Sequence, residues 1–470
     1  MKMTKGVILL WICVCGWLGY SLFVTPHTDY HISEIGSLPV VGQGRTKPLD
    51  SIARNALLTI RGKQYAEIDG KKMQPMAWLL RVLSRPFEAD HDPIFAVHNP
   101  DVKVYLGFSE PKKKLYSYAE LDQKRHAIIT QADKSASIES QLRSPFQSEM
   151  VALRDRIVMY VRLKNSFFPE GVLSYSQYVN HYQGLMQRLD HSQLSNLDQE
   201  EKTAFLTYFD DFQVLDQMSQ FLPIPPPQES DNDQWQSFGT GFVVMMAHKE
   251  LSPMISLMAE ALDAYRDKNS QLFNSKVAQL KNVYETEVPK ESFKSHIESE
   301  FNRFAPFYKS ILLYGFCFAL VLLSWLLPRF VPPFLGNQLL ILAFGVHSIG
   351  LILRMYLQGR PPVTNLYSSA VFIGWIAILV GLCMERIFRN RIGMLMSSVV
   401  GFATLIIAHH LSVQGDTLEM MQAVLDSNFW LSTHVVSITI GMGATFLAGF
   451  LGIYYMIRRL MPRFENKEKK

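Results

Sequence analysis

The pair Trp430 and His434 stands at the start of the last long apolar stretch, in the segment "DSNFWLSTHVV". The residues "DSN" favour a helix start, which puts the two rings four positions apart on one helix face. A neutral imidazole binds transition metals, and one in an apolar, aromatic setting suits the axial position of a heme iron. These residues alone also allow a histidine without a ligand, so heme binding is a hypothesis here.

A second candidate group lies inside an earlier apolar stretch. His347 is near its middle, where an ionisable side chain is costly and therefore marks a functional hypothesis; the alternative is an interhelical hydrogen bond. Arg354 follows two helical turns later on the same face, near the end where a long side chain can reach the surface. His347 and Arg354 together predict a polar stripe on this helix that faces the inside of the helix bundle. By contrast, His409 and His410 end another stretch, and we interpret them as solvated interfacial histidines.

The corner "GRPPVTNLYSS" (359–369) separates two apolar stretches. Its glycine and its proline pair stop the preceding helix. Thr364 or Asn365 can then cap the next helix, and Arg360 is left as a cation beside that helix start. Both features attract anions such as carboxylates. The alternative is a plain capped loop with a surface arginine.

Long apolar stretches position these residues. The chain has 470 residues, of which 48% are hydrophobic, with a net charge of +4. Stretches of about 18 or more apolar residues are candidate membrane spans. We therefore expect a mainly α polytopic membrane protein with about six transmembrane helices and a large helix-rich external domain. The expected spans are 7–24, 311–328, 338–357, 367–385, 394–411 and 430–457; the expected domains are an anchor 1–24, an external domain 25–308 and a five-span membrane domain 309–470.

The basic residues predict the orientation. Lysines precede the first span, arginines follow the second and fourth spans, and "RRLMPRFENKEKK" follows the last. Because basic residues favour the cytoplasmic side, both termini are predicted to be cytoplasmic and 25–308 to be periplasmic, at a bacterial inner membrane. We interpret the first span as a retained anchor; a cleaved signal peptide is the alternative.

The remaining composition excludes several classes. All four cysteines lie in apolar stretches without Cys-x-x-Cys spacing, which argues against a zinc site or a dithiol function. No basic block indicates nucleic-acid binding. The external segment reads as mainly helical, with a strand or turn expected at 100–117 and a Pro-rich break between helices at 222–239.

Three segments resemble one known family. "HSIGLILRMYLQGRPPVTNLYSS" (347–369) is similar to the G-R/H-x-P-x-x-N-x-Y-E stretch of the heme-handling membrane protein of system II cytochrome c synthases, in the cytochrome c assembly family. "VLDSNFWLSTHVVSITIGMGATFLAG" (424–449) resembles its W-L-x-x-H-V segment. "LPVVGQGRTKPLDSIARNALLTIRGKQ" (38–64) is similar to the start of the external domain in long members.

The resemblance implies a task. Such proteins bring heme b to the outer membrane face and present it to apocytochrome c, whose C-x-x-C-H thiols join the heme vinyl groups. Two external histidines and a tryptophan-rich loop hold the heme. The resemblance implies that His434 is the first external ligand, beside Trp430, and that His347 is a second possible iron ligand, on the heme route. It also implies that Arg360 and Asn365 belong to the external rim, where Arg360 pairs with a propionate.

Two departures shape this expectation. Ser368 stands where the family has glutamate, and the tryptophan-rich W-G-x-x-W-x-W-D does not occur. The chain thus resembles the first portion of a synthase, which implies a second subunit carrying that loop and the second external histidine; His409 or His410 as a substitute ligand is an alternative. No general acid or base is identified. Half of a heme lyase, a heme transporter or chaperone without lyase activity, and a non-heme assembly scaffold stay open.

Overall fold

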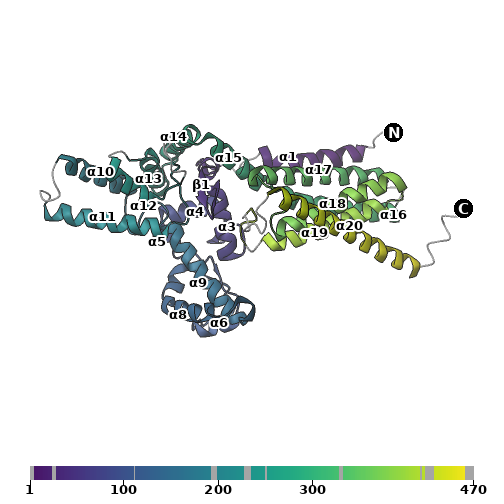
Figure 1. Cartoon of the computed structure of the whole chain (residues 1–470), viewed down its shortest axis with the longest axis horizontal. Helices are drawn as coiled ribbons and strands as arrows, with labels where there is room; N and C mark the ends of the chain where they lie inside the picture. The colour runs from purple at the N-terminus through teal and green to yellow at the C-terminus, as the bar shows by residue number, and fades with distance from the viewer. Residues whose placement is uncertain are drawn as a thin grey trace. The chain divides into compact units, whose positions relative to one another are not determined.

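The computed structural model divides the chain into two compact units. The membrane unit comprises Met1–Thr25 and Glu300–Lys470, and the second unit comprises Pro26–Ser299. The structure describes residues 5–23, 28–110, 112–191, 198–226, 234–248, 251–327, 332–412, 415–418 and 428–460. Both units are built mainly of α-helices, as the sequence predicts (Figure 1).

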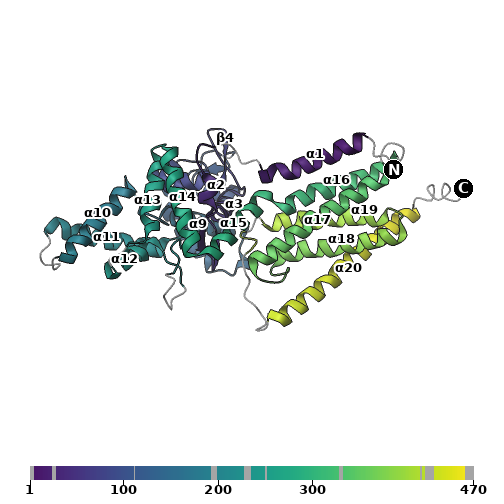
Figure 2. The same cartoon turned by 90° about the horizontal axis from the view of Figure 1, so that it is seen from above.

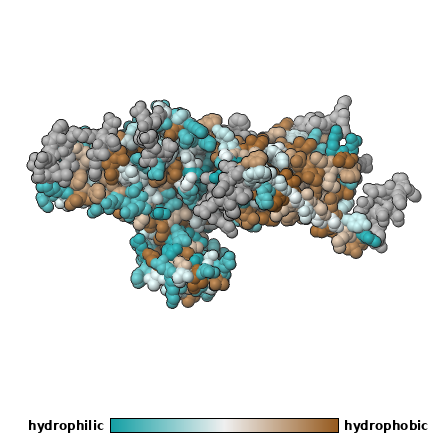
Figure 3. Space-filling view, viewed as in Figure 1, coloured by the Kyte–Doolittle hydropathy of each residue, from teal (hydrophilic) through white to brown (hydrophobic). Residues whose placement is uncertain are grey.

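The membrane unit consists of long apolar helices. Within the described residues, five helical segments are long and apolar enough to cross a membrane, which makes the chain a multi-pass membrane protein: Pro289–Leu326, Phe334–Gln358, Leu366–Phe388, Ile392–Leu411 and Thr433–Ile457. In Figure 3, brown apolar surface covers much of this unit on the face shown. The described apolar part of the first helix, Trp11–Tyr20, is shorter, so the first of the six expected spans stays a prediction. The helices are α1 (Lys5–Phe23), α16 (Pro306–Leu326), α17 (Pro333–Gln358), α18 (Leu366–Phe388), α19 (Ile392–Leu411) and α20 (Asn428–Leu460).

Small residues allow α18 and α19 to pack closely. A Cβ atom added to Gly374 would collide with Thr404, and one added to Gly381 would collide with Ser397. Close backbone approach through small residues is the usual way for helices to associate within a bilayer, where apolar surface gains little by leaving lipid. These glycines therefore let the backbones of α18 and α19 approach each other closely.

The last helix, α20, packs differently. Only 17% of its apolar window is buried, against 44% to 61% for the other four candidate spans. Gly443 is its contact point on α18, since a Cβ there would lie 2.9 Å from Ile376 Cγ2. In Figure 2, α20 is inclined to its neighbours and its N-terminal end stands apart from them. The start of α20 is therefore little covered by the other described helices.

The described residues of the second unit form mainly helices, together with three small antiparallel sheets. Strands β1 (Pro39–Gly42) and β2 (Arg45–Pro48) pair with Pro39 opposite Pro48. The other pairs are β3 (Ala66–Ile68) with β4 (Lys71–Met73), and β5 (Phe95–Ala96) with β6 (Leu115–Tyr116). The helices are α2 (Ile32–Gly36), α3 (Leu49–Arg61), α4 (Pro75–Ser84), α5 (Pro86–Ala89), α6 (Pro100–Tyr105), α7 (Tyr118–Asp122), α8 (Arg125–Ala136), α9 (Pro145–Lys164), α10 (Tyr175–His191), α11 (Gln199–Met218), α12 (Phe238–His248), α13 (Pro253–Arg266), α14 (Ser270–Glu287) and α15 (Pro289–Phe304).

Two local expectations in this unit have different outcomes. The strand or turn expected at 100–117 is wrong for its first half, which forms α6; Asn99 caps this helix by accepting from Asp101 N and Val102 N, and Pro100 occupies the first turn. The break expected at 222–239 does separate α11 from α12. Its described ends pair with each other through Ile224 and Gln236.

The segment "GQGRTKPLDS" (42–51) forms hydrogen bonds to α15. Gln43 and Gly44 both have positive φ, 53° and 77°, as a two-residue hairpin turn requires. The turn places Arg45 so that its Nη1 and Nη2 donate to Glu298 at 2.7 and 2.9 Å. Ser51 Oγ donates to the same carboxylate at 2.7 Å. Glu298 is buried, and these donors compensate for its desolvation.

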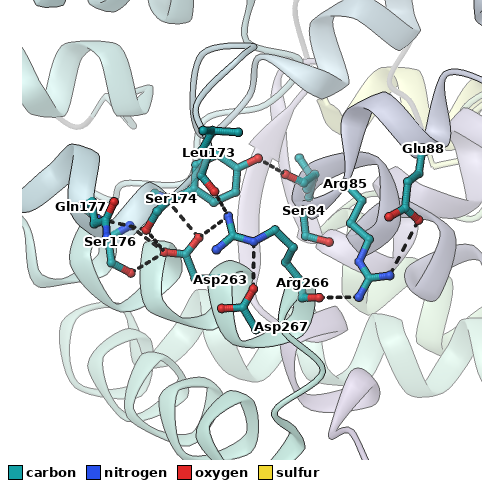
Figure 4. Close-up of polar contacts among 12 residues, drawn as sticks. Ser84, Arg85, Glu88, Leu173, Ser174, Ser176, Gln177, Asp263, Arg266 and Asp267 are labelled. Atoms are coloured by element: carbon teal, nitrogen blue, oxygen red, sulfur yellow. Dashed lines mark hydrogen bonds and ion pairs between the residues drawn. The ribbon is translucent and has the colours of Figure 1, made fainter.

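A second carboxylate joins two helices, and the tyrosine that it caps reaches a third. Asp263 on α13 accepts from Tyr175 N and Ser176 N at the start of α10, at 3.0 and 2.8 Å (Figure 4). It also pairs with Arg266 at 2.9 Å. Tyr175 Oη in turn donates to the Leu83 carbonyl on α4 at 2.7 Å. Because α10 would otherwise begin with unpaired N–H groups, Asp263 acts as its cap from another helix.

Candidate functional site

The intramembrane histidine lies in a fully buried aromatic setting. His347 on α17 has its Nδ1 atom 3.2 Å from Tyr314 Oη on α16, and both residues are 0% exposed. Phe307 meets the imidazole edge-on, with ring centroids 5.7 Å apart and planes at 88°. The ring also interacts with the backbone of Val371 on α18. Its Nε2 atom makes no hydrogen bond of normal geometry with the described residues.

This arrangement makes His347 a contact between three helices. It agrees with the interhelical hydrogen bond that the sequence left open, and the enclosed ring offers no accessible face for a porphyrin. Tyr314 was missed by sequence reasoning. The sequence feature that could have pointed to Tyr314 is its hydroxyl group within an otherwise apolar stretch. Such a group needs a hydrogen-bond partner inside the bundle.

Arg354 extends the same polar stripe. Its side chain is 1% exposed, so it faces inward together with His347, as expected. The guanidinium lies over the Tyr367 ring at 4.7 Å. Its Nη1 donates to Thr417 Oγ1 at 3.3 Å, and its Nη2 donates to the Thr417 carbonyl. An internal carbonyl and an aromatic face hold the guanidinium inside the bundle, so Arg354 does not extend to the surface as its position near the helix end would allow.

The corner 359–369 is a turn that is fixed by hydrogen bonds at both ends. Gly359 ends α17 in the left-handed conformation, with φ 61° and its N–H on the Met355 carbonyl at 2.8 Å. Asn365 caps α18 by accepting from Ser368 N at 2.9 Å. Ser368 Oγ accepts in return from Asn365 N at 2.8 Å, which completes a capping box. Ser368, which replaces the glutamate of the resembled family, therefore has a structural function in this chain.

Asn365 also has a second bond. Its Nδ2 donates to the Thr417 carbonyl at 2.9 Å. Arg360, five positions earlier, is half-buried and forms no hydrogen bond or ion pair with any residue that the structure describes. Of the cations at this corner, Arg360 is therefore the one whose described surroundings leave it available to an external carboxylate.

Trp430 and His434 lie on the first turns of α20. Both side chains are exposed, and Trp430 is 65% exposed. Phe429 lies edge-on to Trp430 with centroids 5.3 Å apart. No described residue forms a hydrogen bond with His434. The helix is described from Asn428 onward, so the predicted start residues Asp426 and Ser427 lie outside the described residues.

The candidate residues thus form two groups. His347, Arg354 and Asn365 belong to the packed side of α17 and the adjoining corner, whereas Trp430 and His434 are on the open side of α20. The exposed pair, rather than the buried group, can receive a large planar molecule from outside the bundle. His409 and His410 are exposed on the last turn of α19, as the interfacial interpretation expects, and the His409 ring is 6.2 Å from that of Tyr308.

The described residues contain no group of three His, Cys, Asp or Glu side chains that could hold a metal ion by themselves. Axial ligation of a porphyrin-bound iron does not need such a group, since one imidazole per face is enough.

No protein-family model matches the chain. It is 32% identical over 177 residues to Protein NrfI from Wolinella succinogenes, an alignment that covers 36% of this chain. The chain spans about a fifth of the length of this relative, since the alignment covers 19% of it.

Proposed function

We propose that this multi-pass membrane protein takes part in cytochrome c maturation. In this proposal it binds heme b as a substrate on the periplasmic face of a bacterial inner membrane and presents it to apocytochrome c. A second subunit completes the site with a tryptophan-rich loop and a second histidine. The similarity to NrfI and the motifs at 347–369 and 424–449 support the assignment to cytochrome c maturation.

The observation that carries the heme-binding part is the exposed pair on α20. His434 offers an imidazole without a described hydrogen-bond partner, and Trp430 offers an aromatic face four positions before it. An aromatic side chain can stack on a porphyrin while the histidine ligates its iron. Arg360 would supply a charge-assisted bond to a propionate. His347 has the donor atom for iron but is enclosed, so its role as a ligand stays a proposal that requires α16 to α18 to repack.

The chemistry that follows belongs to the heme and the apocytochrome. A cysteine thiol adds across a vinyl C=C bond, so that sulfur bonds to one vinyl carbon and the thiol hydrogen goes to the other. The addition is balanced without an external oxidant or reductant. This chain contributes by holding the iron and orienting the vinyl groups toward the thiols, which is catalysis by proximity.

The first experiment is the visible absorption spectrum of the purified protein, compared with His434→Ala and with the control His126→Ala, an exposed histidine of the second unit. We expect a heme Soret band in wild type and His126→Ala, and its loss or shift in His434→Ala. Identical heme spectra in all three would refute His434 as a ligand. Absence of heme from wild type, alone and co-expressed with a tryptophan-rich partner, would refute the heme function.

A further measurement separates a lyase component from a carrier. Co-expression with apocytochrome c and the partner should yield heme that stays with the apocytochrome after acid–acetone extraction. Heme bound to this chain without any covalent product would identify a carrier that lacks lyase activity.

A further inference from the structure

Three side chains of α17 and the corner converge on one short turn. Arg354 and Asn365 both bind Thr417, and Gln358 Nε2 donates to the Leu418 carbonyl at 3.3 Å. The turn 415–418 follows α19 and precedes α20 along the chain. Three polar residues of the 347–369 motif, Arg354, Gln358 and Asn365, are therefore directed at a turn that precedes Trp430 and His434 along the chain.

The centre of this contact is a single carbonyl oxygen. The Thr417 oxygen accepts from Arg354 Nη2 and from Asn365 Nδ2, the latter at 2.9 Å. A carbonyl has two lone pairs, so these two donors saturate it. Because Arg354 is buried, its charge is poorly screened by water and the bond is strong. We call Arg354, Asn365 and Thr417 the Thr417 anchor.

The turn itself is also ordered by local contacts. Leu418 is 4% exposed, and its N–H donates to Asp416 Oδ1 at 2.9 Å, as in an Asx turn. Tyr367 supports the anchor by lying under the Arg354 guanidinium. The anchor thus joins side chains that are 52 and 63 positions from Thr417 in sequence.

We infer that Arg354 and Asn365 are positioning residues, which hold the 415–418 turn that precedes α20 along the chain. The Nδ2 donor of Asn365, a residue that the resemblance places at the external rim, is directed at Thr417 rather than at a propionate. The effect on heme rests on the proposed function, because it acts through His434. The anchor itself does not depend on that function.

Two substitutions at the corner separate anchoring from capping. Asn365→Asp keeps a side-chain oxygen for the Ser368 N–H but replaces the Nδ2 donor with a second oxygen facing the Thr417 carbonyl. Ser368→Ala removes half of the capping box and leaves the Nδ2 donor in place. Arg354→Lys retains the charge but loses the planar fork that reaches both Thr417 atoms.

The test uses the full-length protein and two readouts. Hydrogen–deuterium exchange of the peptide containing 415–418 should accelerate about tenfold in Asn365→Asp and Arg354→Lys, the change expected for losing one net hydrogen bond. The exchange of α18 and α19 should be unaltered, and Ser368→Ala should leave the 415–418 peptide as in wild type. In the same two anchor variants, heme should remain bound with a shifted Soret band.

Each contrary result has a distinct meaning. Unchanged exchange at 415–418 in both anchor variants would overturn the anchor. Faster exchange with a wild-type heme spectrum, while His434→Ala loses heme, would overturn the positioning role and leave the proposed function standing. Heme unaffected by His434→Ala would instead refute His434 as a ligand, and exchange would still decide the anchor. If Asn365→Asp fails to fold, Arg354→Lys carries the test.

Discussion

At the scale of single residues, the main result is how buried polar groups are satisfied. Inside a bilayer each such group needs an internal partner. His347 has Tyr314, and Arg354 has Thr417 and the face of Tyr367. The membrane unit thus contains ionisable residues that serve its own packing, and their presence alone does not identify a ligand site.

Removing the Tyr314 hydroxyl tests whether the bond between Tyr314 and His347 stabilises the packing of the membrane helices. Tyr314→Phe leaves the buried Nδ1 of His347 without its partner, which should cost about 1–3 kcal/mol. The midpoint of thermal unfolding in detergent should fall accordingly. Tyr455→Phe, at a residue 62% exposed, is the control and should be neutral. Equal midpoints for the two variants would show that the Tyr314–His347 bond contributes nothing to stability.

A carboxylate in the second unit gives a pH prediction. Burial raises the pKa of Asp211, although the hydrogen bond from Tyr178 opposes this effect. Since the folded pKa lies above the unfolded value of about 4, the folded state loses stability as pH rises through the folded pKa. Asp211→Asn keeps an acceptor for Tyr178 without a charge.

We therefore expect Asp211→Asn to unfold at a higher temperature than wild type at pH 7, with the difference shrinking as pH approaches 4. Scans of the unfolding midpoint at several pH values measure this. Glu110→Gln, at an exposed carboxylate, is the control and should show no such trend. A difference that instead grows toward low pH would contradict the sign.

At the scale of elements, caps supplied by distant residues connect the helices. Asp263 caps α10 from α13 and pairs with Arg266, which also binds the exposed Asp267. Glu298 similarly receives Arg45 and Ser51 from the hairpin and α3. These buried carboxylates are specific contacts between elements that hydrophobic packing alone would not orient.

The two aspartates on Arg266 form a matched pair for mutagenesis. Asp263→Ala leaves the N–H groups of Tyr175 and Ser176 at the start of α10 without their carboxylate acceptor, and should destabilise the protein by about 2–3 kcal/mol. Asp267→Ala removes an exposed ion pair and should cost less than about 1 kcal/mol. Thermal unfolding and hydrogen exchange over 174–178 measure both. Similar effects of the two substitutions would rule out a capping role for Asp263.

At the scale of the whole molecule, the open question is which side of the membrane each unit faces. The basic residues predict that Pro26–Ser299 is external and that the connection between α18 and α19 is cytoplasmic. This orientation places the start of α20 on the external side, where a heme acceptor would be met.

Single cysteines test this orientation. In a variant without native cysteines, Ser140→Cys should react with a membrane-impermeant maleimide in intact spheroplasts, whereas Arg389→Cys should react only after lysis. Both positions are exposed in the described structure, so exposure does not bias the comparison. Labelling of Arg389→Cys alone in intact spheroplasts would invert the predicted topology.

The sequence by itself determined the features that depend on neighbouring residues. Apolar length predicts the membrane helices, because burying a backbone in lipid requires a continuous apolar helix. The Asn365 cap, the Gly359 stop and the shared face of Trp430 and His434 follow from positions within two helical turns.

Only the tertiary structure decided what the polar side chains bind. Tyr314 is 33 positions from His347, and Thr417 is 63 positions from Arg354. No local periodicity encodes such pairs, since they depend on how α16 to α19 pack. The same packing buries His347 and leaves His434 exposed, although both are histidines in apolar helices. Hydropathy reports that a segment enters the membrane, but the contacts between helices determine which of its side chains remain accessible.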